Sequence, residues 1–258
     1  MKNPFALCLL IFICSCSGYE YVSSPHYVPL HKEKGELTSS VGHNNIQMGY
    51  SLTNHFAVFA AGKYRNTRDN EKHLFGASEG HYSGNNDYQD ESFDVNIGAG
   101  VFNHYQMFKF ETLVSTGLGK MDYEHTRDLV NMYSFDLQAN RLNFYIQQNF
   151  GVNIWKNYLE MGISAKYINF LCYNINNQLT VGDNGDNIST DTYFVGKKTA
   201  RMSFFEPGLT IRGGFHHFKV QTQLISVINL TESRIRYREL SLFVSFSINL
   251  NLLKSKKD

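Results

Sequence analysis

Apolar and polar residues alternate along much of this chain. The clearest stretch runs from Leu142 to Ile154, where every second residue is apolar with few exceptions. Successive side chains of a strand point to opposite faces, so a period of two predicts strands with one apolar and one polar face. The pattern recurs, and we expect strands at 36–42, 46–53, 56–65, 93–104, 107–121, 142–154, 158–173, 201–213, 218–230 and 239–252. Polar inserts are predicted at 66–91, 122–140 and 174–200.

The N-terminus has the features of an export signal. Lys2 is followed by an apolar run from Phe5 to Ile13, which is well short of the roughly 20 residues that a spanning helix needs. The sequence Ile13-Cys14-Ser15-Cys16 resembles the bacterial lipobox, and that resemblance makes Cys16 the expected lipid attachment site. Ordinary cleavage after Cys16 or Gly18, without lipid, is the alternative.

The export signal and the alternating pattern together favour an all-β fold, an antiparallel transmembrane β-barrel. We expect about ten strands, and any number from eight to twelve is compatible with the pattern. The connections alternate between short and long, and an even strand count places both chain ends on the periplasmic side. We therefore divide the chain into a lipoprotein-type signal peptide (1–15), an extended periplasmic tether (16–34), an outer-membrane barrel (35–252) and a periplasmic tail (253–258).

The last predicted strand strengthens this assignment. Between Leu240 and Leu252, apolar residues alternate with Ser and Asn, and the segment resembles the C-terminal strand by which outer-membrane proteins are recognised for assembly. The chain departs from that pattern by continuing to Asp258. Over about residues 35–252 the sequence resembles lipidated bacterial outer-membrane β-barrel proteins. The resemblance implies fold and location, the bacterial outer membrane, and little about activity.

The amino-acid composition limits the classes of molecule that the protein is expected to bind. Lys and Arg number 24 against 23 Asp and Glu, so no strong basic field favours nucleic acid. Of the four cysteines, Cys172 alone would stay free in the mature chain if Cys16 carries lipid, which excludes an intramolecular disulfide. The expected partners are outer-membrane lipids, with lipopolysaccharide or another outer-membrane protein as further candidates.

The polar strand faces would line the barrel. A barrel of about ten strands has a narrow interior that side chains largely fill, so we expect these residues to satisfy one another in a buried charge network. A small or gated pore is the alternative. The inward set is Lys63, Lys109, Glu111, Glu160, Lys166, Glu206, Arg212, Lys219, Gln221 and Gln223.

Catalytic chemistry has one weak candidate, Asp122-Tyr123-Glu124-His125, with Asp94, Asp183 and Asp186 as conceivable partners. His216-His217 falls in a predicted turn, where adjacent side chains diverge. The loop from Gly182 to Asn187 lacks the spacing of an EF-hand. We expect no catalytic, cofactor-binding or metal site.

The expected function is therefore that of a non-enzymatic outer-membrane barrel, a structural, adhesion or accessory component of the cell envelope. A narrow channel for ions or small solutes, a rim-site hydrolase and a lipid-tethered soluble β-sandwich are the alternatives.

Overall fold

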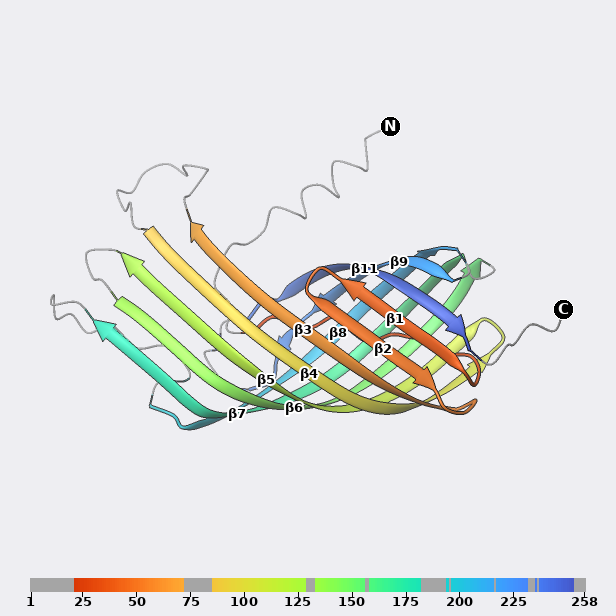
Figure 1. Ribbon diagram of the computed structural model, residues 1–258, viewed down its shortest axis with the longest axis horizontal. Helices are drawn as coiled ribbons and strands as arrows, with labels where there is room; N and C mark the ends of the chain where they lie inside the picture. The colour runs from red at the N-terminus through yellow and green to blue at the C-terminus, as the bar shows by residue number, and fades with distance from the viewer. Residues whose placement is uncertain are drawn as a thin grey trace, which may run out of the picture.

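Ten antiparallel strands close into a β-barrel in the computed structural model (Figure 1). The structure describes residues 21–71, 85–128, 133–155, 158–181, 194, 196–215, 217–231, 235 and 237–252. Among them, none forms a helix with the length and apolar content needed to cross a bilayer. The predicted all-β antiparallel barrel of about ten strands is confirmed.

Neighbouring strands pair in chain order from β1 to β8, and the ring closes through β9 and β11, because β8 pairs with β9 and β11 pairs with β1. A two-residue strand, β10, pairs with β8 beyond the end of β9. The strands are β1 (Glu36–Gly42), β2 (Asn45–Ser51), β3 (Phe56–Glu71), β4 (Asn85–Tyr105), β5 (Phe108–Asp128), β6 (Tyr133–Trp155), β7 (Leu159–Val181), β8 (Thr199–Gly214), β9 (Phe218–Ser226), β10 (Ile228–Asn229) and β11 (Leu240–Asn251).

The barrel has two distinct ends. The base is the end where β1 begins and β11 finishes, and it carries the short β2–β3, β4–β5, β6–β7 and β8–β9 connections. The rim is the opposite end, where β3, β5 and β7 finish. Figure 1 shows that β3 to β7 project far beyond the short strands β1 and β2, so the rim has one high wall and one low wall.

The long strands of the high wall show that the predicted polar inserts were drawn too long. Parts of 66–91, 122–140 and 174–200 belong to strands, since β3 extends to Glu71, β5 to Asp128 and β7 to Val181. The predicted ninth strand is likewise divided into β9 and the stub β10. The inserts look polar in the sequence because strand residues such as Glu91, Glu124, Asp136, Gln138 and Gln178 expose polar side chains on the outside.

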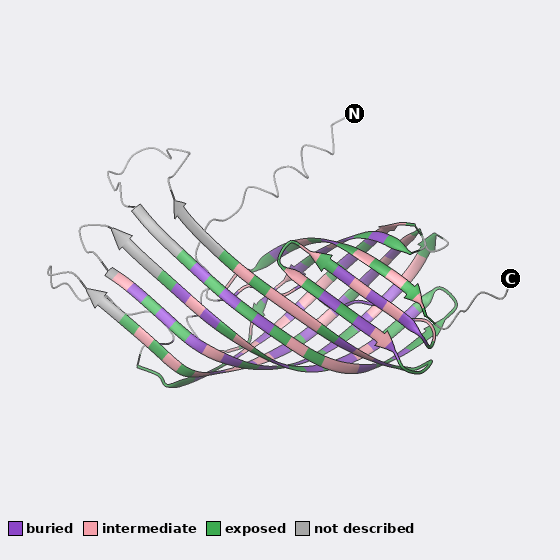
Figure 2. Ribbon diagram, viewed as in Figure 1, coloured by how far each residue is buried: buried purple, intermediate pink, exposed green. Residues whose placement is uncertain are grey.

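The alternation reverses its phase part-way up the high wall. On β6, the outward side chains are apolar from Ile154 to Leu142, with Gln148 as an exception, and polar at Gln138 and Asp136. The inward side chains are polar near the base and apolar beyond Arg141, where Ala139, Leu137 and Phe135 are buried. Buried and more exposed residues alternate along β6 from Ser134 to Gly151, part of the striped pattern of the barrel in Figure 2. Along β6, the lower part of the strand is therefore apolar outside and mostly polar inside, whereas the upper part is polar outside and apolar inside.

The inward apolar residues of the upper wall form a cluster that we call the rim core. It joins residues of β5 to β8 with side chains from the connections that follow β7 and β9. Its buried members include Met121, Tyr123, Phe135, Leu137, Ala139, Phe170, Cys172, Phe194, Ala200, Met202, Phe204, Val227, Ile235 and, from the N-terminal segment, Tyr21. The rim thus carries a hydrophobic core of its own, which connecting segments help to close.

Candidate functional site: a barrel interior filled by the N-terminal segment

Residues 21–34, here called the plug, pass once through the barrel from the rim to the base. At the rim, the Tyr21 carbonyl accepts a hydrogen bond from the Arg238 amide at 3.0 Å. At the base, the Gly35 amide donates to the Ser51 carbonyl at 2.9 Å as the chain enters β1. Between these ends, Ser23 and the residues from Pro25 to His31 are buried. The plug therefore runs through the interior of the barrel from the level of Tyr21 down to the base.

This course corrects one expectation. The sequence interpretation places residues 16–34 in a tether outside the barrel, but residues 21–34 lie within it. The described chain starts at the rim and finishes at the base, where Leu252 pairs with Gly35, while both chain ends themselves lie outside the described residues, so their periplasmic location stays a prediction. The physical reason is that a polar lumen offers the plug's backbone the hydrogen bonds it would otherwise make to water.

Side chains of the barrel wall bind the plug mainly through its backbone carbonyls. Lys63 Nζ donates to Val22 O at 2.7 Å and to Ser23 O at 3.2 Å. Further donors lie along the passage, from β2, β6, β8 and β9. They are Gln47 to Pro25 O (2.7 Å), Gln223 to His26 O (3.0 Å), Gln147 and Asn149 to Tyr27 O (2.6 and 3.1 Å) and Arg212 to Pro29 O (3.3 Å). An extended segment without a strand partner is thus satisfied by side chains.

A carboxylate from β8 anchors the rim half of the plug. Glu206 accepts a hydrogen bond from the Tyr21 hydroxyl, pairs with Lys166 Nζ at 2.5 Å and lies 3.3 Å from His26 Nε2. The other ring nitrogen of His26 lies 2.6 Å from Ser164 Oγ. All four partners are buried or nearly so, which makes each of these polar contacts costly to remove.

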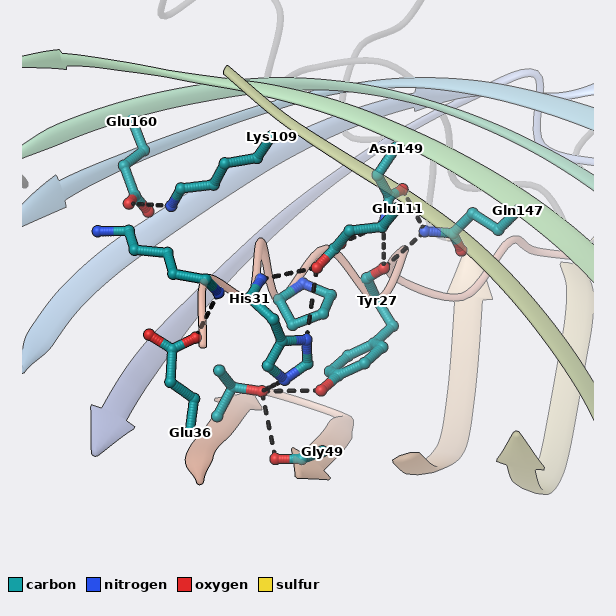
Figure 3. Close-up of polar contacts among 12 residues, drawn as sticks. Tyr27, His31, Glu36, Gly49, Lys109, Glu111, Gln147, Asn149 and Glu160 are labelled. Atoms are coloured by element: carbon teal, nitrogen blue, oxygen red, sulfur yellow. Dashed lines mark hydrogen bonds and ion pairs between the residues drawn. The ribbon is translucent and has the colours of Figure 1, made fainter. Parts of the chain in front are cut away.

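A second carboxylate, Glu111 of β5, anchors the base half (Figure 3). Its carboxylate accepts a hydrogen bond from the His31 backbone amide at 2.7 Å and another from the Asn149 side-chain amide at 3.0 Å. It also lies 3.4 Å from His31 Nδ1. On the opposite wall, the Tyr27 hydroxyl lies 2.7 Å from Thr38 Oγ1. The plug is therefore held from β1 and β5 at the same level.

Three glycines make room for large plug side chains. A Cβ on Gly151 would lie 2.6 Å from both methyl carbons of Leu30, and one on Gly49 would lie 2.7 Å from Cζ of Tyr27. A Cβ on Gly208 would lie 2.9 Å from Nδ1 of His26. Real Cβ atoms do not approach that closely, so the wall is shaped to this segment.

The predicted inward residues do form a buried charge network. Glu160 is the centre of its base part, because Lys109 lies 2.9 Å, Lys219 3.0 Å and Arg212 3.7 Å from its carboxylate. Towards the rim, Arg141 pairs with Asp94 at 2.8 Å and Arg65 with Asp90 at 2.7 Å. All ten predicted inward residues face the lumen, and the structure adds the plug between them.

Little free space remains beside the plug in the described part of the barrel. Two small cavities flank it, each of about 30 Å³. One lies next to Pro29 and Glu160, and the other next to Val22 and Asp94. Each has room for one or two water molecules.

The other sequence candidates are scattered or lie outside the described residues. Asp94 is paired with Arg141, Asp122 is half-buried on β5 and the neighbouring Glu124 is exposed. His217 contacts the Asn249 carbonyl at 2.9 Å. Cys16, Asp183, Asp186, His216 and the side chain of His125 lie outside the described residues. Within the described ranges, no group of three His, Cys, Asp or Glu side chains is placed to hold a metal ion.

Sequence reasoning missed the plug side chains His26, Tyr27 and His31. The one available signal was composition: between Tyr19 and Lys34 the chain has two prolines and several aromatic residues, which suits a buried extended segment better than a free tether. Comparison of the sequence with models of known protein families found no match, and comparison with curated proteins found none either.

Proposed function

We propose that this chain is a non-enzymatic outer-membrane β-barrel, lipidated at Cys16, that serves as a structural, adhesion or accessory component of the cell envelope. The observation that carries the proposal is the reversal of the alternation on the high wall. An outer face that is apolar below Leu142 and polar at Gln138 and Asp136 fits lipid below and water above. A soluble β-sandwich would bury its apolar face instead.

The height of the apolar outer surface supports a bilayer. On β4, the outward side chains from Phe93 to Tyr105 are apolar except Asn103, and this stretch spans about 30 Å along the barrel axis for a strand tilt of about 40°. This compares with an apolar band of about 25 Å on outer-membrane barrels. Exposed aromatic residues gather at the base connections, as in an interfacial belt. They are Phe56, Tyr105, Phe108, Trp155, Tyr158, Phe215 and Phe218.

The orientation follows from the connections. Outer-membrane barrels keep short turns in the periplasm, so we place the base and the tail at 253–258 there and the rim outside the cell. Lipids would contact the apolar outer surface. Lipopolysaccharide or another outer-membrane protein would meet the polar outer face above it, where Lys120 and Glu124 are exposed.

The two alternative functions draw less support. A channel needs a continuous water path, and the plug fills the interior of the described barrel apart from small cavities. A rim-site hydrolase needs a carboxylate or His free to move a proton, whereas Asp94 is engaged by Arg141.

A lysine scan of the outer face tests the membrane assignment. Ile97 on β4 is 63 % exposed and lies within the apolar surface, so Ile97→Lys should cost about 2–4 kcal/mol of folding free energy in bilayers, since it puts a charge among acyl chains. The measurement is urea unfolding of the protein in phosphatidylcholine vesicles. Gln138→Lys, an exposed outward position above the apolar surface, is the matched control and should be neutral. Equal, small effects at both positions would favour a soluble barrel.

A further inference from the structure

The direction of the plug bears on where the N-terminus lies. Along the plug, successive residues contact wall residues that lie progressively nearer the base. Tyr21 and His26 contact Glu206, Pro29 contacts Arg212 on the same strand, and Lys32 reaches Glu36 at the start of β1. The segment is therefore a single, one-way passage and not a hairpin.

Tyr21 is the first residue of the described chain and forms the rim end of the plug. Its ring stacks on Phe204, with the centroids 4.0 Å apart, and packs edge-on against Phe170 at 5.3 Å. Both rings belong to the rim core, and the backbone of Tyr21 bridges to Tyr237 and Arg238 in the connection before β11. Tyr21 thus lies at the rim end of the plug, where the rim core begins.

The two cavities found beside the plug in the described part of the barrel are too small for a second passage of the chain. A second passage through the lumen would need space for a further extended chain beside the plug. The cavities next to the plug have room for one or two water molecules each, and buried side chains such as Lys109, Glu160 and Leu113 line the described interior.

From these observations we infer that the plug carries the N-terminus across the outer membrane, so that Cys16 and its lipid are presented at the cell surface. Cys16 precedes Tyr21 by five residues, which reach at most about 17 Å. The acyl chains would insert into the outer leaflet of the membrane and not into the periplasmic leaflet. The inference rests on the proposed function, since the rim faces outward only if the barrel has that orientation.

Three epitope insertions test the inference in the full-length protein. One tag follows Gly18, one follows Gly80 in the β3–β4 connection at the rim, and one follows Asp258. Antibody binding is compared on intact and permeabilised cells, after a heat-dependent gel shift has shown that each tagged barrel is folded. The tags after Gly18 and Gly80 should bind antibody equally before and after permeabilisation. The tag after Asp258 should need permeabilisation.

The possible failures are distinguishable. A Gly80 tag that is exposed, together with a Gly18 tag that needs permeabilisation, would overturn the passage and leave the outer-membrane barrel intact. A Gly80 tag that needs permeabilisation would overturn the proposed orientation, and the surface assignment of Cys16 with it.

The lipid itself gives an independent readout. In cells grown with labelled palmitate, a protease site placed after Gly18 should let protease added outside intact cells remove the label from the barrel. A Cys16→Ala variant, as control, should carry no label at the start. Label that stays on the barrel after complete surface cleavage would contradict an anchor in the outer leaflet.

Discussion

Deletion of residues 21–31 is expected to convert a non-conducting barrel into a conducting one. The plug fills the axis, and without it the interior would be lined by the polar residues that now bind its backbone, among them Lys63, Gln147 and Arg212. These side chains would hydrate once they lose the plug. In planar bilayers we expect the ionic conductance to rise by at least about an order of magnitude over the full chain.

A synthetic peptide with the sequence of residues 21–33 provides the control. Added to the deletion variant, it should restore the block, since most of its contacts go to backbone carbonyls of the segment and need no covalent link. If the variant refolds poorly, the same peptide should raise the folded yield on heat-shift gels. A folded variant that stays closed without peptide would show that the plug is not the barrier.

Glu160→Gln is expected to be among the most destabilising single substitutions in the barrel. It would leave Lys109, Lys219 and Arg212 buried without the carboxylate that now neutralises them. Removing one partner of a buried ion pair typically costs about 3–5 kcal/mol, because the remaining charge stays desolvated. Unfolding in urea, followed through the fluorescence of the single tryptophan, Trp155, measures the change.

Glu124→Gln is the matched control on the outer surface. Glu124 is exposed on β5 above the apolar surface, so its neutralisation should change the unfolding free energy by no more than about 0.5 kcal/mol. If Glu160→Gln were as mild, water would have to screen the three cations, and the filled interior would give way to the hydrated lumen of a channel.

Much of the barrel could be predicted from the sequence because the strands of its lower half share one pattern of alternating apolar and polar residues. A period of two with apolar residues outside fixes which face each residue occupies, and this sufficed to assign Lys109, Glu160 and Glu206 to the interior before any pairing was known. The strand count followed from the turn signals at Asn44-Asn45 and elsewhere.

The strands of the upper wall could not be predicted from the sequence, because the apolar residues of the alternation point inward there instead of outward. Leu137 and Phe135 still alternate with Gln138 and Asp136, but the apolar residues now point inward. The prediction assumed that apolar residues face outward, so this segment was assigned to a polar insert. The plug could not be predicted for a different reason. Its contacts, such as Tyr27 with Gln147, join residues far apart in the sequence and involve backbone carbonyls, which leave no periodic signal.

The most direct test of the account is to ask what Tyr27 touches in the outer membrane. With p-azidophenylalanine in place of Tyr27, illumination of outer-membrane fractions should yield crosslinks within the chain. Mass spectrometry should map them to the wall that surrounds the ring, at Thr38, Gly49 and Phe59. The same substitution at Tyr105, which is 69 % exposed at the base, should give no crosslink to those positions. Absence of the internal crosslinks, or crosslinks from position 27 to other proteins, would place the segment outside the barrel and contradict the account.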